Sequence, residues 1–320
     1  MTKKEKYAIG VDLGGTNVKL GIVSEKGKIV KKTTVETKAE EGPDSVISQI
    51  KYGINVLLHE NKYKINGIGI GSPGIVALKK GTVENPPNFP GWEKVNLGKI
   101  LQKEFKTVVH VENDANAAAI GELVFGAGKT IDSFIMITLG TGVGGGIVFK
   151  QKIFRGDRGG AGEAGHMTID YKGERCKCGS YGCIETYAGN GYLVRRVQKE
   201  LNKHKDSIIW DLISQKPDNL SPKIIDEAAV KGDTFAKSII HDLGIRLGAA
   251  FSSMSNLLDI TTFIIGGGIA GFGEPLLSTI KDTMSQRVIT PLRPRIKVIP
   301  AKLKNDAGIK GASSLVFYNQ

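Results

Sequence analysis

The sequence predicts an α/β protein built from two related halves. Strand-like and helix-like segments alternate along the 320 residues, which are enough for two hydrophobic cores. The start of the pattern also recurs, because IGVDLGG can be aligned with IMITLGT, and a second strand follows each of them. The aligned pairs are Ile9 with Ile135, Val11 with Ile137, Leu13 with Leu139, and Gly14 with Gly140.

The first half opens with three predicted strands in YAIGVDLGGTNVKLGIVSEKGKIVKKTTVET, which are separated by a glycine turn and an EKGK hairpin. A helix follows in GPDSVISQIKYGINVLLHENKYKI, with Asp44 or Ser45 as its expected cap. A buried strand, INGIGIGSPG, then ends in a tight turn. The predicted order is therefore β-β-β-α-β.

The remaining elements continue this alternation. TVVHVENDANAAAIGELVFGAG predicts a strand that runs into an alanine-rich helix ending at glycine. Beyond the repeat, we expect helices near 191–202, 223–230 and 234–257, a strand in TTFIIGGG, a helix from about Glu274 and a strand in IKVIPA.

Charge and hydropathy exclude several classes of protein. Lys and Arg number 44 against 32 Asp and Glu, a net charge of +12, but the basic residues are spread along the chain. This spread indicates a lysine-rich surface rather than a nucleic-acid-binding one. No stretch is apolar enough for a membrane helix, and the N-terminus has no signal-peptide core, so we expect a cytoplasmic protein.

Three glycine loops follow predicted strands, at 12–16, 139–146 and 265–273. A dinucleotide site is disfavoured, because the second loop leads into a strand and the strand after the third lacks an acidic end. The sequence also has no P-loop motif. The loops suit a nucleotide held between two lobes, with Asp12 holding Mg²⁺ through water, although each alone could be a tight hairpin without a ligand.

Asn113 and Asp114 stand where a predicted strand ends and a helix begins. Either residue could simply be the N-cap of that helix. The carboxyl ends of strands also face the ligand in many α/β proteins, and there an Asp could accept a proton from an attacking hydroxyl during phosphoryl transfer. Both interpretations can hold, one for each residue.

The three cysteines of the chain are Cys176, Cys178 and Cys183, and with His166 they have the ligand types and number of a closed structural zinc site. A disulfide would leave one cysteine over, and three unrelated buried thiols are the alternative. Such a site would fix Glu163, His166 and Glu185, whose side chains suit the hydroxyls of a polyol such as a sugar.

The combination of these motifs resembles the ROK family of repressors, open reading frames and sugar kinases over nearly the whole chain. The stretch ENPPNFPGWEKVNL is most similar to the glucokinase branch. The other matching motifs are DLGGTNVKLGIV, GIGIGSPG, VENDANAAAIGE, LGTGVGGGIV, GEAGHMTID, CKCGSYGCIETYAG and IIGGGIAGFGEPLL.

The resemblance implies an actin-like, hexokinase-like fold with a ribonuclease H-like repeat and an interlobe cleft. We expect a small lobe at 1–112, completed by about 303–320, and a large lobe at 113–302 with the zinc segment at 163–185. By this resemblance the protein is an ATP-dependent kinase that phosphorylates the 6-hydroxyl of glucose, with Asp114 as the general base. A homodimer or homotetramer is expected.

The resemblance also assigns ligands to particular positions. The expected hexose-binding residues are Gly74, Asn113, Asp114, Glu163, His166 and Glu185. The expected nucleotide-binding residues, for ATP with Mg²⁺, are Asp12, Gly14, Gly15, Thr16, Asn17, Lys19, Thr141, Gly142, Gly267 and Gly268. The expected Zn²⁺ ligands are His166, Cys176, Cys178 and Cys183.

Three alternatives remain at this point. The substrate could be another hexose, such as N-acetylmannosamine, N-acetylglucosamine, fructose or mannose. The donor could be polyphosphate instead of ATP. Because some ROK proteins are repressors, the chain could also be a sugar sensor without activity, although the first strand begins near Tyr7 and we expect no helix-turn-helix domain before it.

Overall fold

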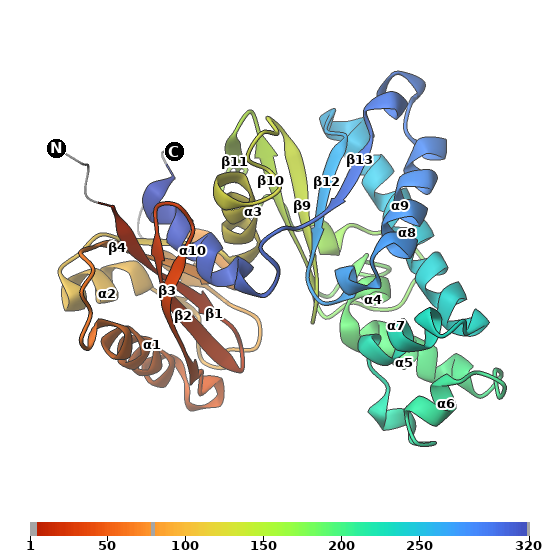
Figure 1. The fold of residues 1–320 in the computed structure, drawn as a ribbon, viewed down its shortest axis with the longest axis horizontal. Helices are drawn as coiled ribbons and strands as arrows, with labels where there is room; N and C mark the ends of the chain where they lie inside the picture. Colours follow the sequence, from red (N-terminus) through yellow and green to blue (C-terminus); the bar gives the residue numbers. More distant parts are fainter. Residues whose placement is uncertain (1–4, 78–80, 319–320) are drawn as a thin grey trace. The chain divides into compact units, whose positions relative to one another are not determined.

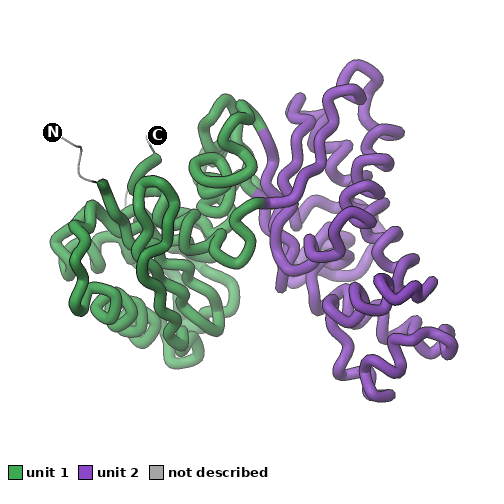
Figure 2. Tube along the Cα trace, in the orientation of Figure 1, with its two compact units in different colours: residues 1–133, 146–162, 302–320 green, residues 134–145, 163–301 purple. Residues whose placement is uncertain are grey.

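A computed structural model describes residues 5–77 and 81–318 of the chain (Figure 1). The chain folds as two compact units, which Figure 2 distinguishes by colour. Unit 1 comprises Met1–Ser133, Gly146–Gly162 and Lys302–Gln320, and unit 2 comprises Phe134–Gly145 and Glu163–Ala301. The predicted α/β class is confirmed.

Unit 1 is built on a five-stranded sheet with the order β3-β2-β1-β4-β8. Strands β1, β2 and β3 are antiparallel, whereas β1, β4 and β8 are parallel. The strands are β1 (Tyr7–Leu13), β2 (Asn17–Ser24), β3 (Ile29–Glu36), β4 (Ile65–Ser72) and β8 (Val109–Asn113). A three-stranded sheet contains β5 (Ile75–Ala77), β6 (Thr82–Glu84) and β7 (Lys94–Val95). The helices are α1 (Pro43–Leu58), α2 (Leu97–Phe105), α3 (Asp114–Phe125) and α10 (Ala307–Phe317).

The second five-stranded sheet has the order β11-β10-β9-β12-β13. Its strands are β9 (Phe134–Leu139), β10 (Val143–Phe149), β11 (Lys152–Phe154), β12 (Thr262–Gly266) and β13 (Lys297–Pro300). Position by position this order matches the first sheet, with β9 in place of β1 and β10 in place of β2. The internal repeat predicted from IGVDLGG and IMITLGT is therefore confirmed as a repeat of topology.

Helices make up most of the rest of unit 2. They are α4 (Glu185–Ala188), α5 (Asn190–Leu201), α6 (Ile209–Leu212), α7 (Pro222–Val230), α8 (Thr234–Leu258) and α9 (Glu274–Arg287). Short 3-10 helices include η3 (Ala164–His166) and η5 (Ile269–Phe272). The predicted helices near 191–202, 223–230, 234–257 and from Glu274 are confirmed as α5, α7, α8 and α9.

The core of unit 1 follows from two periodicities. Helix α1 buries Val46, Ile50 and Ile54, which recur every four residues along one face. Strand β2 buries Leu20 and Ile22 in the same apolar cluster. Each such side chain contributes roughly 1.5–3 kcal/mol to folding when it is fully removed from water.

The expected cap of the first long helix was wrong. Gly42 is the N-cap of α1, and no side chain caps the helix. Asp44 lies in the first turn, and the Ser45 hydroxyl donates a hydrogen bond to Glu41 Oε2 at 2.7 Å. Pro43 occupies the first helical position, where the lack of an N–H group costs nothing.

The boundaries of the two units differ from those of the lobes expected at 1–112 and 113–302. Unit 1 continues through α3 to Ser133, includes Gly146–Gly162 and resumes at Lys302. The reason is packing, because α3 lies against α10 and β4 of the same unit. The buried Glu122 carboxylate of α3 also accepts a hydrogen bond from the backbone N–H of Leu303 at 2.8 Å.

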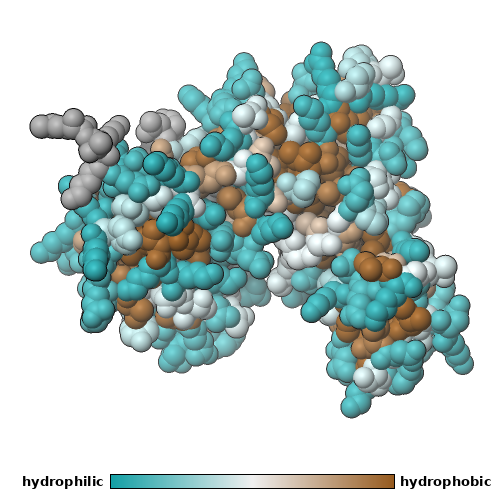
Figure 3. Space-filling model, in the orientation of Figure 1, coloured by the Kyte–Doolittle hydropathy of each residue, from teal (hydrophilic) through white to brown (hydrophobic). Residues whose placement is uncertain are grey.

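The surface reflects the charged composition. Hydrophilic residues cover much of both units on the face drawn in Figure 3. Across residues 5–77 and 81–318, no helix has the length and apolar character needed to cross a membrane.

Candidate active site

Two carboxylates meet at one edge of the unit 1 sheet. Asp12 lies near the carboxyl end of β1, in register with Gly71 of the parallel strand β4. Gly71 is paired in turn with Glu112 of β8, and Asp114 follows directly after that strand. A Cβ atom at Gly71 would stand 3.6 Å from the Asp114 Cα. The carboxyl ends of parallel strands therefore bring Asp12 and Asp114 together, where α/β proteins bind their ligands.

Of Asn113 and Asp114, only one is needed as the N-cap of the helix that follows β8. Asn113 is the N-cap of α3, because its Oδ1 accepts hydrogen bonds from the N–H groups of Ala115 and Asn116 at 3.0 and 3.1 Å. Its Nδ2 donates to the Gly74 carbonyl at 3.2 Å, which ties two of the predicted hexose-binding residues together. Asp114 is the first residue of the helix and is not needed as its cap.

The surroundings of the two carboxylates favour their neutral forms. Atoms crowded around Asp114 reduce the hydration of its carboxylate and raise its pKa, although a hydrogen bond from the N–H of Ala115 at 2.8 Å opposes this. The side chain still has surface open to solvent, so its hydration is reduced rather than lost. Burial also raises the pKa of Asp12. The positive charge of Lys19, directly opposite on β2, lowers this pKa, and the negative charge of Asp114 raises it.

The first glycine loop, between β1 and β2, has a defined support. Gly14 N–H donates to the carbonyl of Asn17 at 3.1 Å, and the Thr37 hydroxyl donates to the Gly14 carbonyl at 2.6 Å. Gly15, Thr16 and Asn17 are exposed, as binding to a phosphate requires. The Asp12 carboxylate lies against the first turn of α10, where a side chain at Gly308 would overlap it.

The second glycine loop, between β9 and β10, is fixed from within unit 2. Gly140 N–H donates to the Gly142 carbonyl, and the Gly140 carbonyl accepts from Asn190 N–H, both at 2.9 Å. Glu185 Oε2 accepts from the N–H of Val143 at 3.0 Å and lies so close that a Cβ at Gly142 would overlap it. Thr141 is exposed, and so are Gly267 and Gly268 between β12 and η5.

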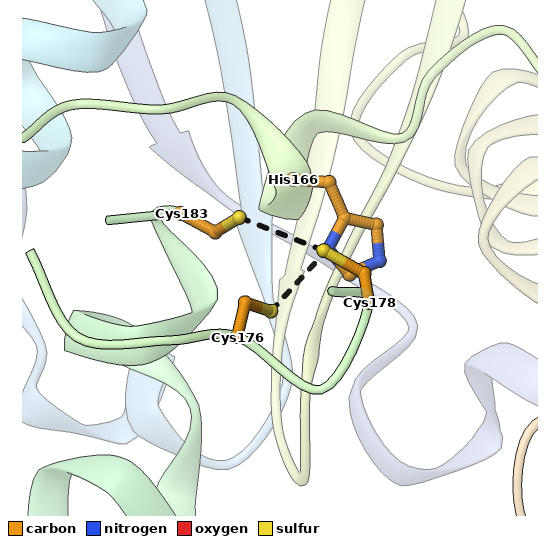
Figure 4. A group of neighbouring side chains, drawn as sticks. All are labelled: His166, Cys176, Cys178 and Cys183. Atoms are coloured by element: carbon orange, nitrogen blue, oxygen red, sulfur yellow. Dashed lines mark hydrogen bonds between the residues drawn. The ribbon is translucent and has the colours of Figure 1, made fainter. Parts of the chain in front are cut away.

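His166, Cys176, Cys178 and Cys183 form one cluster, shown in Figure 4. Their ligand atoms all lie within 4.8 Å of one another, with 3.7 Å between the sulfurs of Cys178 and Cys183 and 3.8 Å between Cys176 Sγ and His166 Nδ1. Sulfurs at the corners of a tetrahedron around zinc, with bonds of about 2.3 Å, are separated by about 3.8 Å. The cluster therefore fits Zn²⁺ in ligand type, number and spacing.

The protonation of the cluster depends on the metal. Burial raises the pKa of the Cys183 thiol to about 12 in the metal-free protein. Because zinc binds the thiolate, its binding must release protons from this site.

Other polar groups lie close to the Cys₃His cluster. With Nδ1 of His166 turned toward the sulfurs, its Nε2 stands 3.9 Å from Glu163 Oε2. Metal binding at Nδ1 would leave the proton on Nε2, where it can be donated. Glu185 bridges the cluster and the glycine loop, since its Oε1 lies 3.9 Å from Cys176 Sγ while Oε2 holds Val143. Glu163, His166 and Glu185 are thus gathered at one candidate metal site.

Sequence reasoning missed three residues that support these sites. Thr37 is fully buried and holds the first glycine loop. Glu112 and Arg155 form an ion pair that is mostly removed from solvent, and Glu112 Oε1 accepts a hydrogen bond from the N–H of Asn113. The sequence does contain a signal for Glu112. A charged residue inside the apolar strand VVHVEN requires a partner when it is buried.

Comparison with known proteins places the chain in a family. The model of the ROK family matches residues 8–318, and the chain belongs to the ROK family. It is 36% identical to a glucokinase of Thermotoga maritima over 96% of both chains. It is also 30% identical to a xylose repressor of Caldicellulosiruptor bescii, over 96% of this chain and 77% of the repressor.

A solved structure gives the same result for the fold. The ROK family glucokinase from Streptomyces griseus, in complex with glucose and AMPPNP, matches with a TM-score of 0.85 and 36% identity. The match covers 97% of this chain and 98% of that one. The predicted hexokinase-like kinase fold is therefore confirmed.

Proposed function

We propose that the protein is an ATP-dependent hexose kinase of the glucokinase type, which transfers the γ-phosphoryl group of MgATP to the 6-hydroxyl of glucose. The observation that carries this proposal is the position of Asp114 at the carboxyl end of β8, next to a capping Asn113 and across the sheet from Asp12. The glucokinases that resemble the chain over nearly its whole length support it.

In this reaction Asp114 accepts the proton of the sugar 6-hydroxyl as that oxygen attacks the γ-phosphorus. The new oxygen–phosphorus bond forms while the bond to the bridging oxygen breaks, and ADP leaves with the electron pair. Asp12 would hold the Mg²⁺ of MgATP through water. The other residues expected to bind the nucleotide in the first and second glycine loops contact ATP. Gly267 and Gly268 do so in the third loop.

The sugar hydroxyls are assigned to the other residues expected to bind the hexose, which are Gly74, Asn113, Glu163, His166 and Glu185. Zinc held by His166, Cys176, Cys178 and Cys183 would have a structural role, because four protein ligands leave no position for water. His166, bound to the metal through Nδ1, would donate from Nε2 to a hydroxyl, and the two carboxylates would accept.

A sugar-sensing role without catalysis is the second candidate, and the similarity to a xylose repressor is the observation that favours it. A sensor would bind a hexose without consuming ATP, whereas a kinase does both. The cytoplasmic location and the dimer or tetramer stay predictions.

The proposal is tested by ADP release from MgATP with glucose, mannose, fructose and the two N-acetylated hexoses, beside polyphosphate as donor. We expect the highest kcat/KM with glucose and ATP. Turnover mainly with an N-acetylated sugar would keep the kinase and contradict glucose. Hexose binding without turnover in zinc-loaded protein would favour the sensor.

The pH dependence of kcat/KM should report the state of Asp114. The base must be ionised to act, and crowding raises its pKa. Activity should therefore fall as the pH drops toward this raised pKa, which lies above the usual Asp value of ~3.9. Initial rates at constant free Mg²⁺ and saturating ATP measure this limb. Asp12 has a raised pKa as well, so the Asp12→Asn variant serves as the control. Its residual activity should still fall at low pH as in the wild type, because Asp114 is unchanged.

A further inference from the structure

Arg155 and Glu112 form an ion pair whose side chains are mostly removed from solvent. Arg155, which follows β11, places its Nε 2.8 Å from Glu112 Oε2, and the two side chains are 15% and 3% exposed. Among the ion pairs found in residues 5–77 and 81–318, no other has partners as little exposed. An ion pair in such a place is a poor source of stability, because desolvation offsets the attraction, so another role is indicated.

The second oxygen of Glu112 reaches the segment around Asp114. Glu112 Oε1 accepts hydrogen bonds from the N–H of Asn113 at 3.0 Å and from Asn116 Nδ2 at 3.3 Å. Asn113 immediately precedes Asp114, and Asn116 lies in the first turn of the same helix and is buried. The carboxylate therefore joins Arg155 on one side to both flanks of Asp114 on the other.

We propose that Arg155 and Glu112 are positioning residues for Asp114, an inference that rests on the proposed kinase function. Arg155 selects the rotamer of Glu112, and Glu112 fixes the junction between β8 and α3 at which Asp114 begins the helix. Neither residue has to touch the substrate. A catalytic base must be held within a fraction of an ångström, and a displacement of about 1 Å can cost ~10²-fold in rate.

The same arginine anchors the chain that leads to a second site residue. The Arg155 carbonyl accepts a hydrogen bond from Ala161 N–H at 3.1 Å, which closes a short loop two residues before Glu163. Its guanidinium and its backbone therefore act on different parts of the proposed site. Substitution of the side chain tests the first of these contacts and leaves the second in place.

The test compares four variants and one control variant with the wild type in the glucose assay and in thermal unfolding. In Glu112→Gln the amide has one oxygen, so either Arg155 or the N–H groups of Asn113 and Asn116 lose their acceptor. Arg155→Lys keeps the charge without the planar fork. Arg155→Met leaves a buried carboxylate unpaired and can unfold, so the double variant Glu112→Gln/Arg155→Met removes both charges. Arg158→Met is the matched control, because the Arg158 side chain is 93% exposed.

We expect kcat to fall by about 10–100-fold in Glu112→Gln, Arg155→Lys and the double variant, with the KM for ATP changed less than about threefold. The double variant should recover the unfolding temperature lost in Arg155→Met without recovering kcat. If kcat returned together with stability, or stayed near the wild-type value throughout, the pair would be structural only. A wild type without turnover would instead contradict the proposed kinase function.

Discussion

Replacing Asp114 by Asn should lower kcat by ~10²–10⁴-fold while the fold and much of the hexose binding remain. The amide keeps the shape of the side chain and an oxygen that can accept from the N–H of Ala115, but it cannot take the proton of the 6-hydroxyl. Initial rates at saturating glucose and MgATP, beside hexose titration by calorimetry, separate the two effects. Near-normal turnover would remove Asp114 from its proposed role.

The stability of this variant gives an independent check. A carboxyl whose pKa is raised on folding favours the folded state at low pH and loses that contribution as the pH rises through the raised pKa. At neutral pH the ionised Asp114 is therefore unfavourable, and Asp114→Asn should unfold at the wild-type temperature or above it. Asp44→Asn is the matched control, because Asp44 lies in the first turn of α1 as Asp114 does in α3.

The parts predictable from sequence were those set by local pattern. The period-two runs in β1 and β9, with a glycine after each, were enough to reveal the repeat that the two sheet orders confirm. The cap at Asn113 and the Cys₃His cluster were also accessible, because both depend on residue types at short spacing. The cap of α1 was not accessible, because Gly42 has no side chain and so offers no capping group that the sequence could show.

Long-range contacts were not predictable in the same way. Arg155 stands 43 positions from its partner Glu112, and Thr37 stands 23 positions from Gly14. Neither pair has a fixed spacing that the sequence could display, since the fold alone brings them together. The end of unit 1 was misplaced for a related reason, because α3 is held by α10, which lies almost at the other end of the chain.

Replacing Cys178 by Ser should lower both the zinc content and the unfolding temperature. Cys178 supplies one corner of the tetrahedron, and a neutral hydroxyl is a far weaker zinc ligand than a thiolate. Loss of a direct ligand should weaken zinc binding by more than the ~10–100-fold typical of outer-shell changes. Metal analysis of the purified protein and thermal unfolding with and without a chelator measure both quantities.

Ser180→Ala is the matched control for this substitution. Ser180 lies in the same exposed turn, and its backbone carbonyl, which accepts from Cys176 N–H at 2.8 Å, is unchanged by the variant. It should keep its zinc and its stability, whereas a chelator should destabilise the wild type strongly and Cys178→Ser little further. Because Glu185 joins the cluster to Val143, zinc loss should also raise the KM for ATP. Zinc-free wild type of full stability would contradict a structural metal here.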